Sequence, residues 1–160
     1  MIAAAITASG IYASQCVNKR IKIIESCISL IKQFSCDIEY CNMPVNELFA
    51  KAVNTQCFSD LEFLKSVYLN KSESFKDKWK ASVNLFGRKN PLLKSDLILL
   101  EGFGEKLGTT DCKHQVQLCD EYIKRFSAVY DKALNRKEEH MKLCRLGGAA
   151  GAVFFIIMML

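Results

Sequence analysis

The chain carries an uncharged, largely apolar run at each end, and basic residues flank the inner side of both runs. Residues 1–17 contain no charged side chain, and neither do residues 146–160. The flanking cations are Lys19, Arg20 and Lys22 after the first run and Lys137, Lys142 and Arg145 before the second. This pattern predicts a domain that is attached to one face of a bilayer by both of its ends.

Both runs are short for membrane-spanning helices, which need about 20 apolar residues. The first run could also be a signal peptide, and the last run could be a buried core helix. We favour uncleaved anchors, because the first run has no basic start and the last run is apolar on all sides. The sequence therefore predicts an N-terminal transmembrane anchor at 1–17, a helical domain at 18–145 and a C-terminal transmembrane anchor at 146–160.

Both basic flanks belong to the middle domain, so with two spans that domain must lie on a single side of the membrane. The positive-inside rule predicts that this side is the cytoplasm, where acidic membrane lipid would attract the same residues. The formal net charge of +5 is spread along the chain. Because no basic stripe is interleaved with aromatic residues, the pattern argues against nucleic acid as a partner.

Eight cysteines are present, but none forms a CxxC pair. Structural zinc sites usually contain such pairs, so we expect no metal. In the cytoplasm the thiols would stay reduced and behave as small apolar residues, whereas outside it they could form four disulfides. A cysteine-rich redox- or metal-sensing membrane protein remains the alternative function.

The middle domain has helical periodicity and only two prolines. Apolar residues step by three and four through 19–41, and further helices are expected at 45–53, 59–68, 75–86, 91–107 and from 112 onward. The expected boundary signals are Pro44 in a first turn, a capping box at Ser59, Asn90 as an N-cap, and Gly87 and Gly108 as helix ends. These elements predict an all-α, antiparallel bundle of about six helices, in which the first and last helices run side by side into the membrane.

Catalytic patterns are weak in this sequence. Glu101 and Glu105 are one helical turn apart, as solvated helix faces often are. The group of Asp111, Cys112 and His114 is too close in sequence for a nucleophilic triad, which assembles across a fold. The glycines at 102 and 104 lack the lysine and the strand of a phosphate loop. We therefore expect a protein that is not an enzyme and uses no cofactor.

The segment 103–111 is unusual because glycine inside a helix costs about 1 kcal/mol relative to alanine. One interpretation is close helix packing followed by a C-cap. The other is a turn that presents Glu105 and Asp111 to a partner. Both can hold at once.

This segment resembles the FGxxLGxxDxxxQ stretch of the stage III sporulation protein AB family of endospore-forming bacteria. The matching residues are Phe103, Gly104, Leu107, Gly108, Asp111 and Gln115. The stretch from Asp37 to Tyr40, followed by Pro44, is similar to that family's turn after a long first helix. Two departures are Cys41, where the family usually has glycine, and Cys112, where arginine commonly follows the aspartate.

The resemblance implies a non-enzymatic part of the channel complex that links mother cell and forespore. By analogy with the inner-membrane platform protein of type II secretion, it would dock a cytoplasmic secretion-type ATPase and other channel membrane proteins. Its location would be the mother-cell membrane that faces the forespore. The sequence leaves homo-oligomerisation open. The candidate partner-binding residues are Glu105, Asp111, Asp37 and Tyr40.

Overall fold

The computed structural model contains only helices within the residues that it describes, which are 2–69 and 74–159 for the backbone and 14–69 and 74–139 for the side chains. The six α-helices in these residues are α1 (Ile2–Cys41), α2 (Val45–Asn54), α3 (Phe63–Leu69), α4 (Phe75–Lys89), α5 (Lys94–Lys106) and α6 (Cys112–Met159). A short 3-10 turn, η1 (Gln56–Phe58), lies between α2 and α3. The predicted all-α class and the number of helices are therefore confirmed.

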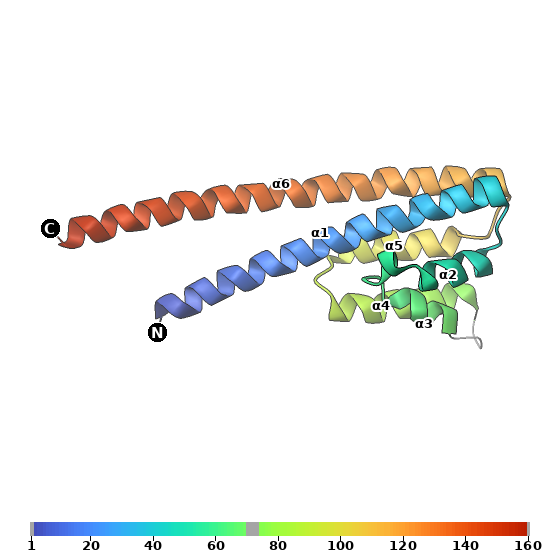
Figure 1. The fold of residues 1–160 in the computed structure, drawn as a ribbon, viewed down its shortest axis with the longest axis horizontal. Coiled ribbons are helices and arrows are strands. Elements are labelled where there is room, and N and C mark those ends of the chain that lie inside the picture. Colours follow the sequence, from blue (N-terminus) through green and yellow to red (C-terminus); the bar gives the residue numbers. More distant parts are fainter. Residues whose placement is uncertain (1, 70–73, 160) are drawn as a thin grey trace.

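The bundle is built on two long helices. α1 and α6 lie side by side and run in opposite directions, so that both chain termini lie at the same end (Figure 1). At 1.5 Å per residue, α6 is about 70 Å long and α1 about 60 Å, whereas α4, the longest of the four short helices, spans about 22 Å. The layer of α2–α5 consequently covers only the part of α1 and α6 that is distant from the termini (Figure 1).

The single tryptophan holds the short helices together. Trp79 of α4 is completely buried. Its ring centroid lies 5.7 Å from that of Phe49 in α2, 5.2 Å from Phe63 in α3 and 6.1 Å from Phe103 in α5. Such aromatic pairs contribute about 0.5–1.5 kcal/mol each beyond the area they bury. The orientation of the short helices therefore depends on one indole ring.

A largely buried ion pair joins α1 to the start of α5. Arg20 donates from Nε and Nη2 to the two carboxylate oxygens of Asp96, at 2.7 and 3.0 Å. Oδ2 of Asp96 also accepts the backbone N–H of Leu93 at 3.0 Å, which caps α5. The prediction that Asn90 caps this helix is wrong, because residues 91–93 are not helical and the helix begins at Lys94.

Two other predicted boundaries are also wrong. Ser59 does not cap α3, because the chain first makes consecutive tight turns in which Ser59 bonds to Gln56 and Leu61 to Phe58. Gly87 does not end α4, which continues to Lys89. A β-carbon at Gly87 would lie 2.5 Å from the Leu97 side chain, so this glycine allows α4 and α5 to approach each other.

The predicted anchors fall mostly on residues whose side chains the structure does not describe, 1–13 and 140–160. The backbone of residues 2–13 and 140–159 continues α1 and α6 as helix. Among the residues that the structure does describe, no helix has the length and apolarity needed to cross a bilayer.

Candidate partner-binding surface

The two segments that carry the family resemblance meet at one end of the bundle. The last turn of α1 and the turn between α5 and α6 both lie at the end opposite the chain termini (Figure 1). A β-carbon at Gly108 would lie 2.8 Å from Cγ2 of Val45, so the two segments are in close contact. Glu39 from one segment and Cys112 from the other line a groove together. We call residues 37–45 and 103–115 together the distal corner.

Gln115 holds the turn of the distal corner in place. Its side chain is only 4% exposed. Its Oε1 accepts the N–H of Gly108 at 3.0 Å, and its Nε2 lies 2.8 Å from Oγ1 of Thr110 and 3.3 Å from the carbonyl of Lys106. Gly108 has a φ of +77°, a conformation that glycine adopts without strain. Glycine and glutamine together therefore fix the shape of this turn.

Gly104 serves close helix packing, so that interpretation of the segment is confirmed. A β-carbon at this position would lie 2.3 Å from atoms of the Trp79 ring. The indole Nε1 donates to the carbonyl of Leu100 at 2.8 Å, which fixes the ring against α5. Phe103 and Leu107 are buried as well. Most of the family motif thus builds the distal corner from within.

Of the four predicted partner-binding residues, three are exposed and one is buried. Tyr40 is 77% exposed at the end of α1, and Glu105 and Asp111 are exposed on the other side of the corner. Asp111 bonds to His114, and that hydrogen bond lowers the pKa of its carboxyl. Asp37 is only 5% exposed. It accepts Nζ of Lys51 at 2.7 Å, so it fastens α1 to α2 and does not present its charge on the surface.

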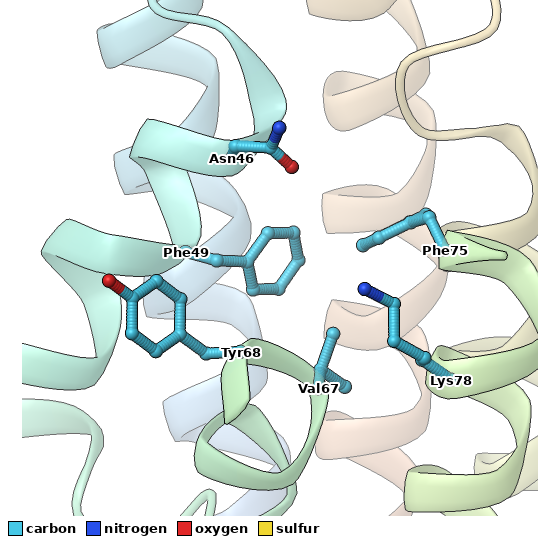
Figure 2. A pocket seen from close by; sticks show the side chains of 6 residues that line it. All are labelled: Asn46, Phe49, Val67, Tyr68, Phe75 and Lys78. Atoms are coloured by element: carbon cyan, nitrogen blue, oxygen red, sulfur yellow. The ribbon is translucent and has the colours of Figure 1, made fainter. Parts of the chain in front are cut away.

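A second hollow lies between α2, α3 and α4. Figure 2 shows Phe49 near its centre, with Tyr68 of α3 to the left, Val67 of α3 below, and Phe75 and Lys78 of α4 to the right. Among the lining residues that the structure describes, Lys78 is the only charged one. These residues pair no acid with a base, so we do not assign chemistry to this hollow.

The family model of stage III sporulation protein AB matches residues 1–160, which is the whole chain. The chain belongs to the stage III sporulation protein AB family. The searches of curated proteins and of solved structures returned no match. Family membership assigns the chain to stage III of sporulation.

The seven cysteines of this family member that the structure describes are all free thiols. Burial raises the pKa of Cys27 and of Cys119 to about 12, so both thiols are protonated at neutral pH. Within the described residues, no three His, Cys, Asp or Glu side chains are arranged to hold a metal ion.

Sequence reasoning missed the buried polar contacts of this family member. Gln115 could have been found, because it occupies the buried stripe of α6 at helical spacing with Cys119, Tyr122 and Phe126. A polar residue on such a stripe must find partners inside the fold. Lys51 gave no comparable signal, since it resembles any surface lysine until α2 is packed on α1.

Proposed function

We propose that this protein is a non-enzymatic membrane component of the channel complex between mother cell and forespore. In this proposal it acts as a platform that docks a cytoplasmic secretion-type ATPase and other channel subunits at the distal corner. The observation that carries the proposal is the position of this corner. The two segments that carry the family resemblance meet there, at the end of the bundle farthest from the apolar terminal runs.

The antiparallel arrangement of α1 and α6 supports attachment by both ends. It brings residues 1–17 and 146–160, which are uncharged, to the same end of the molecule. A single membrane would then receive both. Residues 18–41 of α1 would extend about 36 Å from that membrane at 1.5 Å per residue. The distal corner would consequently stand clear of the lipid, on the cytoplasmic side.

The chemistry of the distal corner suits a protein partner. Tyr40 offers a large aromatic surface with a hydroxyl tip, and tyrosine is enriched at the centres of protein interfaces. Glu105 and Asp111 add exposed negative charge, which favours a partner surface that carries Lys or Arg. Because Gln115 and Gly108 hold the turn rigid, little conformational entropy would be lost on binding.

The test is affinity capture from sporulating cells with the intact, tagged protein. Tyr40→Ala is compared with Tyr68→Ala, a matched control in α3 whose ring is 47% exposed. We expect the natural protein and the control to recover a secretion-type ATPase and channel subunits, and Tyr40→Ala to recover at least fivefold less ATPase. Equal recovery by both variants would place the contact elsewhere, and the absence of any ATPase would remove the platform function.

The predicted location has a separate test. An impermeant thiol reagent is applied to intact cells and to lysed cells, and labelling of the exposed Cys36 and Cys57 is measured. A domain in the cytoplasm is labelled only after lysis. Labelling in intact cells would place the domain on the outer face.

A further inference from the structure

Three cations from two distant parts of the chain line one groove. Lys19 comes from α1, and Arg88 and Lys89 come from the last turn of α4; Asn90 lies beside them. The groove has a volume of about 410 Å³. All three cationic side chains are exposed. We call this site the basic groove.

Among the side chains that the structure describes, no carboxylate lines the basic groove. The neighbouring cations of α1 are already engaged, since Arg20 pairs with Asp96 and Lys22 with Asp60, at 2.7 and 3.0 Å. Within the residues that the structure describes, Lys19, Arg88 and Lys89 belong to no ion pair. Arg20 and Lys22, two of the three cations that follow the first apolar run, are therefore paired within the fold. Arg88 and Lys89 of α4 add positive charge beside the third, Lys19.

The position of the basic groove matches the level of a membrane surface. Lys19 follows the apolar run by two residues on the same continuous helix. The connection from α4 to α5 lies at the edge of the short-helix layer that faces the chain termini (Figure 1). If residues 1–17 enter a bilayer, Arg88 and Lys89 therefore reach the depth of the lipid headgroups together with Lys19.

Helix electrostatics alone explain only part of this arrangement. Cations in the last turn of a helix interact favourably with its carboxyl end, and this accounts for Arg88 and Lys89 on α4. It does not account for Lys19, which approaches from the middle of α1. Three cations that converge without a carboxylate repel one another, so an anion is the natural occupant.

We infer that the basic groove binds the phosphate of an anionic phospholipid headgroup. This inference rests on the proposed attachment to a membrane. The planar guanidinium of Arg88 can donate two parallel hydrogen bonds to phosphate oxygens, and the two lysines supply charge on either side. Bound lipid would fix the tilt of the short-helix layer relative to the bilayer.

The test measures lipid binding to the full chain in mild detergent. Phosphatidylglycerol and phosphatidylcholine are titrated separately, and the bound lipid is counted by native mass spectrometry. The groove variant carries Lys19→Gln, Arg88→Gln and Lys89→Gln. The control variant carries Lys65→Gln, Lys80→Gln and Lys113→Gln, which makes the same change in net charge at exposed lysines outside the groove.

We expect the natural protein and the control variant to bind phosphatidylglycerol at least tenfold more tightly than phosphatidylcholine, and the groove variant to lose this preference. Equal affinity for both lipids, or the same loss in the control variant, would overturn the inference. Competition by inorganic phosphate as effective as that by phosphatidylglycerol would assign the groove to a free anion and overturn it too.

Flotation with phosphatidylcholine vesicles separates this inference from the proposed function. A chain that fails to float with neutral vesicles has no bilayer attachment, and then the platform proposal fails together with the inference. A chain that floats equally well in all three forms but shows no lipid preference is attached, and then only the headgroup site is refuted.

Discussion

The substitution Gly104→Ala tests whether the family motif builds the distal corner by close packing. A β-carbon at this position would overlap the Trp79 ring, with atoms 2.3 Å apart. The ring cannot retreat freely. It is completely buried, and Phe49, Phe63 and Phe103 surround it with centroids 5.2–6.1 Å away.

The expected loss of stability follows from three effects. Overpacking a well-packed core costs about 1–3 kcal/mol. A shift of the ring also weakens its hydrogen bond to the Leu100 carbonyl, which contributes about 1 kcal/mol. Alanine returns about 1 kcal/mol of helix propensity relative to glycine. We therefore expect the free energy of unfolding to fall by about 1–3 kcal/mol.

Trp79 is the only tryptophan, so its fluorescence reports urea unfolding of the same core directly. The matched control is Gly102→Ala in the same helix, where a β-carbon would meet only the hydroxyl end of Tyr122, at 2.9 Å. Tyr122 is buried, but only its hydroxyl end must shift, and the gain in helix propensity of about 1 kcal/mol offsets that cost. The control should therefore stay within about 0.5 kcal/mol of the natural protein. If Gly104→Ala proved as stable as the control, close packing would not be the reason for this glycine.

Three further predictions concern the buried polar groups. Asp96→Asn leaves the Arg20 guanidinium without its counter-charge, so the free energy of unfolding in urea should fall by about 3 kcal/mol. Asp60→Asn breaks an exposed ion pair and should lower it by less than about 1 kcal/mol. Equal losses in the two variants would refute the role of burial. Gln115→Ala should release the turn between α5 and α6, seen as faster hydrogen exchange of backbone amides 106–110, and unchanged exchange would show that the turn is held otherwise. Because burial raises the pKa of the Cys27 thiol to about 12, the folded chain keeps a proton that the unfolded chain releases above about pH 9. Between pH 9 and 11 the free energy of unfolding should therefore fall with pH, and its slope should exceed that of Cys27→Ala by about 1.4 kcal/mol per pH unit. Parallel pH profiles of the two proteins would contradict this.

The sequence predicted the helices well because their apolar residues recur with helical spacing. The stripe of α1 that includes Ile24, Ile31 and Phe34 is buried as its period requires. The short turns were harder. Near Ser59 a capping pattern competed with the burial of Phe58 and Leu61, and burial decided the local path of the chain. Local signals describe what a segment can do in isolation, whereas packing selects among those options.

Contacts between charged residues could not be predicted in the same way. Arg20 and Asp96 are 76 positions apart, and neither differs in sequence from an ordinary surface residue. The same holds for Asp37 and Lys51. Periodicity identifies a buried face but not which polar groups will share it. For this reason the sequence predicts Asp37 as a surface contact, whereas in the fold it braces α1 against α2.

The pattern of burial in the family motif separates two roles that the sequence alone had merged. Phe103, Gly104 and Gln115 of the motif are buried and set the shape of the distal corner, whereas Asp111 of the motif is exposed. Glu105, which lies between motif positions, is also exposed. Substitution at a buried motif position therefore alters the fold and the surface together. Glu105→Lys reverses a charge on the surface of the distal corner, and Glu138→Lys makes the same change at an exposed position on α6 as a control. Exposed positions such as Glu105 are therefore the best places to test the choice of partner.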